Sequence, residues 1–196
     1  GGGSIGFTKA GTGLVTLTNA NNSYTGATQV VQGTLSVTDI GNGGQASGIG
    51  ASSADSANLR LEGATLRYTG TGDTSDRGFT FAKSGAIIGS GIEVTDAGPN
   101  LTFGGLVTSS DGANFTKSGA GTLTLATDAN DFTGTTTVTG GLLSTDTLAN
   151  GGLVSGIGQS SSASANLVLA RGGLQYTGGT VRTDRGFTLG AGNRTG

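Results

Sequence analysis

The sequence predicts an all-β fold in which short strands stack into a parallel β-solenoid built from tandem 108-residue units. Three observations support this prediction: an ungapped internal repeat, short segments in which apolar and polar residues alternate, and glycine-rich turns between these segments. Gly supplies 41 of the 196 residues, whereas Pro occurs once and Cys, His, Met and Trp do not occur. A composition this rich in Gly favours short strands that are joined by tight turns.

The repeat is visible as motifs that return with a constant offset and without a gap. About four in ten of the overlapping positions are identical. The clearest pairs are Phe7-Thr8-Lys9 with Phe115-Thr116-Lys117, Ser47-Gly48-Ile49-Gly50 with Ser155-Gly156-Ile157-Gly158, and Asp76-Arg77-Gly78-Phe79-Thr80 with Asp184-Arg185-Gly186-Phe187-Thr188. We therefore expect one continuous solenoid with a first unit at residues 1–108 and a second, truncated unit at residues 109–196.

The strand segments alternate with period two and are rich in β-branched residues, which indicates one buried face per strand. No window shows a sustained helical stripe with caps. A β-sandwich would have a similar strand spacing, but it does not require a long ungapped repeat, whereas a solenoid does. With three strands per coil, each unit would make roughly four coils and the chain roughly seven. The expected strands are 14–18, 28–31, 34–37, 58–61, 65–68, 78–81, 86–88, 92–94, 101–103, 115–117 and 122–125.

The composition excludes several kinds of partner. The net charge is −2 and the ten Lys and Arg residues are scattered, so no basic stripe is available for nucleic acid. No apolar run approaches the ~20 residues of a membrane span, so we expect no membrane insertion by this segment. Without Cys or His, we expect no metal site of those ligands and no cofactor. The absence of Cys also suits an exported protein that avoids disulfides.

Two segments resemble the autotransporter-associated β-strand repeat, also called the passenger-associated transport repeat. The motif residues lie in GTGLVTLT (11–18), NSYTGAT (22–28) and VQGTL (31–35), and in their equivalents at 119–125, 130–136 and 138–143. Members of this family are large, Gly-rich bacterial surface or secreted proteins whose passengers are right-handed parallel β-helices, often adhesins. The resemblance therefore implies a right-handed parallel β-helix that is located outside the cell or on the bacterial surface.

One adjacent pair of opposite charges is repeated intact, as Asp76-Arg77 and Asp184-Arg185. It could form a surface contact for a ligand that is displayed once in each unit. Alternatively, the pair forms a turn before a strand, in which Asp accepts hydrogen bonds from nearby backbone N–H groups. The turn is the favoured interpretation, and the contact is the candidate site.

Catalysis is not expected, although a β-helix that acts on polysaccharide remains the alternative. Asp73 with Asp76, or Asp128 with Asp131, could supply an acid and a base. In the other copy, however, Asp73 is replaced by Val181, and neither carboxylate of the second pair is repeated.

Three other repeated features have simple structural interpretations. Lys9 and Lys117 precede glycine-rich turns, and we expect them on a solvent-exposed face. The Asn residues repeated at 22/130, 42/150 and 58/166 are expected to satisfy turn backbone groups. Thr-x-Thr pairs at 16/18 and 135/137 could bind ordered water in an ice-binding solenoid, but Leu and Tyr interrupt the row and ordinary strand formation explains them.

The predicted function is that of a structural and adhesive shaft segment of a large bacterial surface or secreted protein. The expected partners are the solenoid itself, through end-to-end or lateral contacts, and host or matrix surfaces or glycans. Neither end of the sequence shows a capping segment, so we expect a segment of a longer array or a subunit stacked end to end as a fibre. Leu17 and Leu125 are predicted to point into the core.

Overall fold

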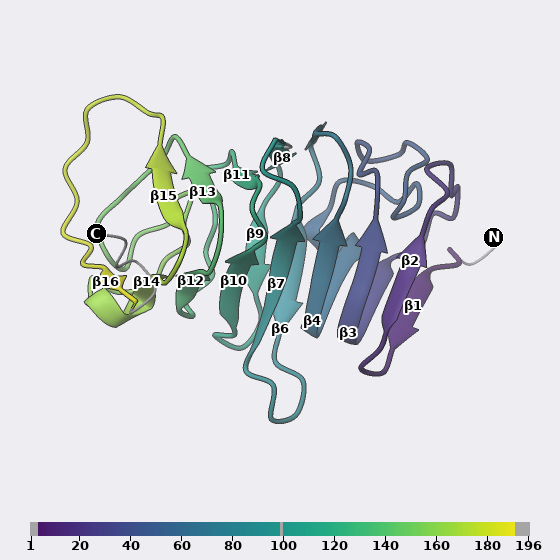
Figure 1. Cartoon of the computed structure of the whole chain (residues 1–196), viewed down its shortest axis with the longest axis horizontal. Helices are drawn as coiled ribbons and strands as arrows, with labels where there is room; N and C mark the ends of the chain where they lie inside the picture. Colours follow the sequence, from purple (N-terminus) through teal and green to yellow (C-terminus); the bar gives the residue numbers. More distant parts are fainter. Residues whose placement is uncertain (1–3, 99, 191–196) are drawn as a thin grey trace.

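The computed structural model describes residues 4–98 and 100–190, and every structural statement below concerns these residues. They form a stack of parallel strands wound around one long axis (Figure 1). The strands are β1 (Phe7–Ala10), β2 (Leu14–Leu17), β3 (Thr28–Val37), β4 (Leu59–Tyr68), β5 (Asp73–Ser75), β6 (Phe79–Ala82), β7 (Gly89–Val94), β8 (Asn100–Phe103), β9 (Val107–Ser109), β10 (Asn114–Ser118), β11 (Thr122–Leu125), β12 (Thr136–Val138), β13 (Leu142–Thr145), β14 (Leu167–Leu169), β15 (Gly173–Tyr176) and β16 (Thr188–Leu189). Two single-turn 3₁₀ helices, η1 (Ser56–Asn58) and η2 (Ser164–Asn166), complete the described elements, and neither could cross a membrane.

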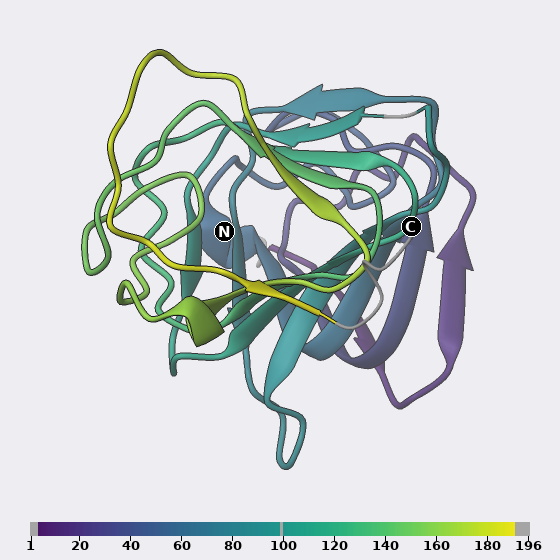
Figure 2. The same ribbon diagram turned by 60° about the vertical axis from the view of Figure 1, so that its left-hand side comes forward.

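The strand pairings define three faces around the axis, which Figure 2 shows obliquely. Face 1 contains β1, residues 28–31 of β3, residues 59–62 of β4, β6 and β9. Face 2 contains β2, residues 34–37, residues 65–68, β7, β10, β12, β14 and β16. Face 3 contains β5, β8, β11, β13 and β15. The predicted all-β parallel solenoid is therefore confirmed.

β3 and β4 each turn a corner between faces 1 and 2 without interruption. The corner residues have positive φ angles: +66° at Gln32, +65° at Gly33 and +58° at Gly63. Gly tolerates this conformation without a steric penalty, which explains why glycine occurs at the corners. A Cβ at Gly33 would also lie 2.5 Å from the carbonyl oxygen of Gly13 on the coil below, so close stacking requires glycine there as well.

The core is a narrow apolar column that runs along the axis. Phe79, Phe81, Phe103, Phe115 and Phe132 are fully buried, and their ring centroids lie 5.1–6.2 Å apart along a continuous series of contacts. These distances suit tilted and edge-to-face aromatic packing. The core is therefore filled by stacking one coil on the next, as a solenoid requires.

One predicted strand is absent, and two observed strands, β5 and β9, have no counterpart among the predicted segments of either unit. Residues 86–88 lie in a protruding hairpin closed by the Ser84–Ile87 bridge, and Ile87 and Ile88 are 41% and 60% exposed. Their β-branched side chains suggested a strand, but they lie outside the stacked strands and stay partly exposed. The short strands β5 and β9 consist mainly of Asp, Thr and Ser, so alternation did not reveal them; only their partners on adjacent coils define them.

The two predicted inward-pointing leucines differ in burial. Leu125 is 0% exposed, whereas Leu17 is half-buried on the first coil, where no earlier described coil covers it. The expected lack of end caps concerned Gly1–Gly3 and residues 190–196, most of which lie outside the described residues.

Candidate contact surface

The repeated Asp–Arg pair lies at a corner of the solenoid and contacts a long loop of the preceding coil. Asp76 accepts a hydrogen bond from the backbone N–H of Gly43 through Oδ1 at 2.7 Å. The Asn42 side chain in turn accepts a hydrogen bond from the backbone N–H of Asp76 at 3.0 Å. These two reciprocal bonds join residues far apart in the sequence, so the pair tethers one coil to another.

Arg77 supplies most of this tether from a buried position, with only 1% of the residue exposed. Its Nε donates to the carbonyl oxygen of Gly41 at 2.9 Å, its Nη1 to Ser52 Oγ at 2.8 Å, and its Nη2 to the carbonyl oxygen of Gly50 at 3.1 Å. Burial lowers the pKa of Arg77, and the neighbouring Asp76 carboxylate partly opposes this effect. The planar guanidinium can satisfy several carbonyls at once, which an ammonium group on a flexible stem does less well.

The second copy repeats the arrangement. Asp184 Oδ1 accepts from the backbone N–H of Gly151 at 2.7 Å, and Arg185 Nε donates to the carbonyl oxygen of Ala149 at 2.9 Å. Arg185 Nη2 also donates to the carbonyl oxygen of Gly158 at 2.7 Å. Arg185 is only half-buried because it lies on the last described coil. The geometry of the pair is therefore a property of the unit and not of one position.

We call residues 41–58 and 149–166 the clamped loops, because the Asp–Arg pairs hold them against the next coil. Each contains a tight serine turn, in which Ser47 Oγ donates to the carbonyl oxygen of Gly50 and Ser155 Oγ donates to that of Gly158, both at 2.8 Å. The tips of the loops are exposed and differ between the copies: Gln45-Ala46 in the first and Leu153-Val154 in the second. Each clamped loop thus combines a fixed frame with a variable, exposed tip.

The repeated asparagines satisfy backbone groups, as expected. Asn130 is fully buried; its Nδ2 donates to the carbonyl oxygen of Gly156 at 3.0 Å and its Oδ1 accepts from the N–H of Val107 at 2.8 Å. Asn58 and Asn166 each donate to the carbonyl oxygen of a serine within their own clamped loop, Ser53 and Ser161, at 3.3 Å, and to its hydroxyl at 2.8 Å.

The expectation that Lys9 and Lys117 face solvent is wrong. They are 3% and 0% exposed, and they point inward on their strands. Lys117 Nζ donates to the carbonyl oxygens of Ser118, Gly119 and Gly140 at 2.8–3.0 Å. Lys9 Nζ donates in the same way to carbonyls of its own turn and of the next coil. Sequence alternation indicated the inward direction in both copies, but the charge of lysine outweighed it in the prediction.

Burial lowers the pKa of Lys117 to about 8, although the nearby Glu93 carboxylate raises it. The Lys117 ammonium group lies inside a glycine-rich turn and holds three carbonyl oxygens that point toward it. A buried cation is tolerated at this position because every one of its hydrogen-bond donors finds an acceptor.

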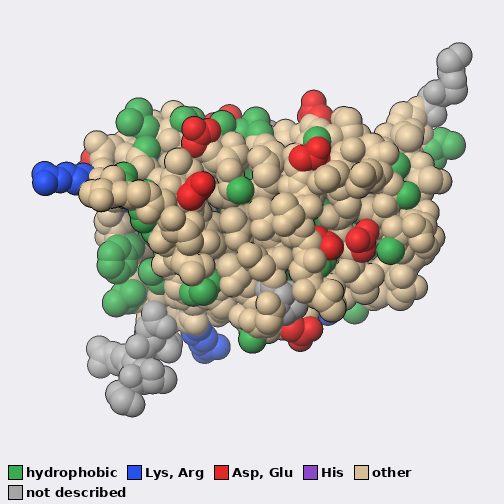
Figure 3. Space-filling view, turned by 90° about the horizontal axis from the view of Figure 1, so that it is seen from above, with side chains coloured by type: hydrophobic (Ala, Val, Ile, Leu, Met, Phe, Trp, Pro, Cys, Tyr) green, Lys and Arg blue, Asp and Glu red, His purple; other side chains and the backbone are tan. Residues whose placement is uncertain are grey.

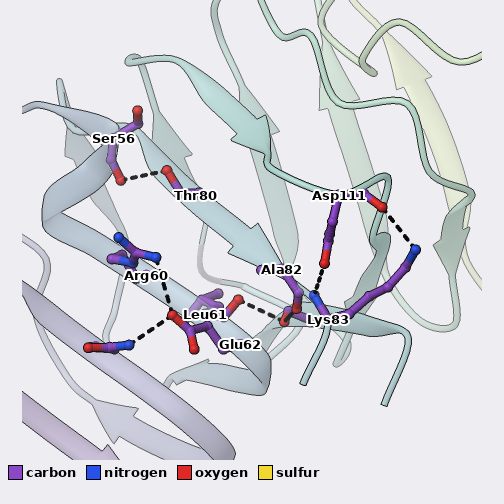
Figure 4. Close-up of polar contacts among 10 residues, drawn as sticks. Ser56, Arg60, Leu61, Glu62, Thr80, Ala82, Lys83 and Asp111 are labelled. Carbon is purple, nitrogen blue, oxygen red and sulfur yellow. Dashed lines mark hydrogen bonds and ion pairs between the residues drawn. The ribbon is translucent and has the colours of Figure 1, made fainter. Parts of the chain in front are cut away.

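The outer side of face 1 carries polar contacts that run from coil to coil (Figure 4). Glu62 Oε1 accepts a hydrogen bond from Gln29 at 2.8 Å and lies 3.3 Å from the Arg60 guanidinium. Lys83 Nζ donates to the carbonyl oxygen of Asp111 at 2.9 Å on the next coil. Exposed contacts of this kind contribute about 0–1 kcal/mol each, so they align the coils more than they stabilise them.

The carboxylates considered for catalysis are separated in role. Asp73 Oδ2 accepts a hydrogen bond from the backbone N–H of Ile40 at 2.8 Å. Asp76 belongs to the Asp–Arg pair that holds the first clamped loop. Asp128 lies in a polar hollow with Asp146 but with no aromatic side chain among the residues that line it. A larger groove on face 2, of about 430 Å³, is lined by Gly, Ala, Ser, Thr, Asn and Ile, without a carboxylate. Neither hollow combines clustered acids with an aromatic sugar platform.

Figure 3 shows one side of the solenoid, on which charged side chains are scattered among neutral ones and do not form one charged patch. The exposed surface is therefore suited to many weak, local contacts. The four residues of the candidate site differ in exposure: Asp76 and Asp184 are exposed, Arg185 is half-buried and Arg77 is buried. A ligand contact at these positions stays a prediction. The hydrogen bonds that hold the clamped loops give the four residues a structural role.

The fold and the repeated motifs define the class of this chain. Residues 7–37 and 115–144 match the passenger-associated-transport-repeat family, so the chain is a parallel β-solenoid that carries two such repeats. It is 57% identical over 192 residues to the adhesin BmaC autotransporter of Brucella suis biovar 1 (strain 1330). That match covers 98% of this chain and 6% of the relative's length. No solved structure matches the chain. The sequence resemblance and the extracellular or bacterial surface location are thereby confirmed.

Proposed function

We propose that the chain is an adhesive shaft segment of a larger surface protein, and that its two end faces bind further coils of the same fold. The tandem units 1–108 and 109–196 supply the repeated surface of this shaft. The contacts are non-enzymatic, which agrees with the name of the relative as an adhesin and with the composition of the two hollows described above.

The observation that carries the proposal is the difference in burial between equivalent residues of the two units. Phe187 is 56% exposed and Leu189 is 61% exposed on the last described coil, whereas their equivalents Phe79 and Phe81 are completely buried. In the first unit, Phe79 packs against Phe103 of the following coil with ring centroids 5.1 Å apart. The face at the C-terminal end of the described stack therefore exposes apolar side chains whose equivalents in the first unit are covered by the following coil.

An apolar hollow of about 200 Å³ marks the same end face, lined by Leu148, Ile157, Leu167, Leu174, Thr183, Arg185 and Phe187. At the opposite end of the stack, a residue of the first unit is exposed and its equivalent in the second unit is buried. Val15 is 36% exposed on the first coil, whereas its equivalent Leu123 is 0% exposed. Apolar residues exposed at both ends of the described stack give each end face a surface on which a coil of the same fold could pack.

Sedimentation of the chain over a range of concentrations tests the end contact. We expect concentration-dependent association that Phe187→Asp abolishes and that Leu142→Asp, a matched change at an exposed residue on the side of face 3, leaves unchanged. A chain that remains monomeric at high concentration, or equal loss in both variants, contradicts end-face stacking.

Adhesion is tested separately by binding of the chain to immobilised glycans, matrix proteins and the chain itself, with a polysaccharide hydrolysis screen on the same material. Multivalent presentation of the chain on beads should convert weak binding into stable attachment, because linked weak contacts gain effective concentration. Turnover of a polysaccharide without attachment would favour the enzymatic alternative.

A further inference from the structure

Equivalent strands of the two units lie on different faces of the solenoid. Thr8 lies on face 1, where it pairs with Gln29, whereas its equivalent Thr116 lies on face 2, where it pairs with Gly91 and Thr137. The same advance by one face occurs at other equivalent positions. They are Leu14 and Thr122, Thr34 and Leu142, Arg60 and Val168, Thr65 and Gly173, and Thr80 and Thr188.

The advance follows from the lengths of the coils. The register on face 1 leads from Thr8 through Gln29, Arg60 and Thr80 to Thr108. Four complete coils therefore bring the chain back to face 1 at Thr108, before it reaches Thr116, the sequence equivalent of Thr8. The short segment between these two residues carries the chain around the corner onto face 2. One unit therefore spans four coils and one third of a fifth.

The clamped loops follow the same displacement. The first leads into β4 on face 1 and the second leads into β14 on face 2. Since each loop leaves the solenoid at the corner before the face that it enters, the two loops project from adjacent corners. Their exposed tips, Gln45 and Leu153, are equivalent in sequence and make the same turn hydrogen bond to Asn42 and Asn150, both at 3.1 Å.

We infer that the repeated contact surface winds around the shaft, each unit presenting its clamped loop about one third of a turn from the previous one. This inference rests on the proposed role of the chain as a shaft with repeated contacts. With ~4.8 Å between rungs, one unit advances ~21 Å, and the same side recurs after three units, ~62 Å along the axis. Such a surface fits separate partner molecules that approach from different sides, rather than one partner lying along a single face.

The variable tips give this arrangement a specific consequence. Gln45-Ala46 and Leu153-Val154 stand on the same frame but differ in polarity. Neighbouring units therefore present chemically different tips in different directions.

The test uses the full chain with Gln45→Cys and Leu153→Cys, since the chain has no other cysteine. The short coil from Arg60 to Thr80 has 20 residues. At ~3.3 Å per residue such a coil gives faces ~22 Å wide, so tips at adjacent corners lie ~30 Å or more apart. Tips at the same corner would lie ~21 Å apart, because only the axial advance would separate them. Spin labels at the two cysteines should report the longer distance, and biotin at both should hold two molecules of monovalent streptavidin at once.

A matched control uses Thr34→Cys with Thr137→Cys. These residues lie on face 2 four rungs apart, so their labels should lie ~19 Å apart although the residues are not equivalent in sequence. The equivalent pair Gln29→Cys with Thr137→Cys should give a distance about 10 Å longer. A reversed order of these two distances, or a single streptavidin on the doubly biotinylated chain, overturns the inference. These measurements involve no natural ligand, so a failure to find adhesion would count against the proposed function alone.

Discussion

Replacing Arg77 by Met is predicted to loosen the first clamped loop and to destabilise the chain by about 3 kcal/mol. The substitution removes three short, charge-assisted hydrogen bonds while it preserves most of the apolar stem. Each such bond contributes about 1.5–3 kcal/mol net, but the cost of burying the cation is recovered when the charge is removed. The carbonyl oxygens of Gly41 and Gly50 each keep a second donor, the hydroxyls of Ser75 and Ser47, which limits the loss further.

The second unit supplies the matched control. Arg185→Met removes the equivalent guanidinium from a half-buried position, where water replaces the lost partners, so we expect a loss of about 1 kcal/mol. Urea denaturation measures both free energies of unfolding. Hydrogen exchange of the Gly43 and Gly44 amides, which bond to Asp76 and to the carbonyl oxygen of Ser52, reports the loop itself. Equal losses in both variants, or unchanged exchange of these amides in Arg77→Met, would refute the structural role of the buried clamp.

Three further perturbations test the core, the buried lysine and a turn. Leu125→Asp should destabilise the chain by about 4 kcal/mol or more, because it buries an unpaired carboxylate, whereas the outward-facing Thr124→Asp should change the unfolding midpoint little. Burial lowers the pKa of Lys117 from 10.5 to about 8. Between these pH values the unfolded state binds more protons than the folded state, so the free energy of unfolding should rise by about 2 kcal/mol from pH 8 to pH 10. Lys117→Met should remove that pH dependence in urea titrations, and a persistent slope would contradict the assignment. Gly50→Ala should cost clearly more than Gly44→Ala: both glycines have φ +81°, but a Cβ at Gly50 would lie 2.5 Å from a tyrosine ring and one at Gly44 meets nothing within 4 Å. Equal thermal shifts would show that backbone strain alone sets both costs.

The candidate site was predictable only in part from the sequence. The repetition of Asp76-Arg77 at Asp184-Arg185 indicated a common role, and the chemistry of Asp indicated that it accepts from backbone N–H groups. The predicted donors lay in the local turn, whereas the observed donor, the N–H of Gly43, lies on another coil. The arginine partners were not predictable, because they lie on another coil, far away in the sequence. Lys117 shows the same limit: alternation placed it inward, but the three carbonyls that make burial acceptable are brought together only by the turn and the next coil.

The sequence by itself determined the all-β class, the alternation of buried and exposed positions in most strands, the glycine turns and the repeat period. These features depend on neighbours along the chain and on the period-two geometry of a strand, so they can be read locally. The tertiary structure alone decided which strands stack, because the length of a coil varies: the step from Gln29 to Arg60 is much longer than the step from Arg60 to Thr80. It also decided that residues 86–88 form an exposed hairpin, and that equivalent residues such as Thr8 and Thr116 lie on adjacent faces. A sequence period measures length along the chain, whereas the direction in which a residue points depends on the sum of the coil lengths before it.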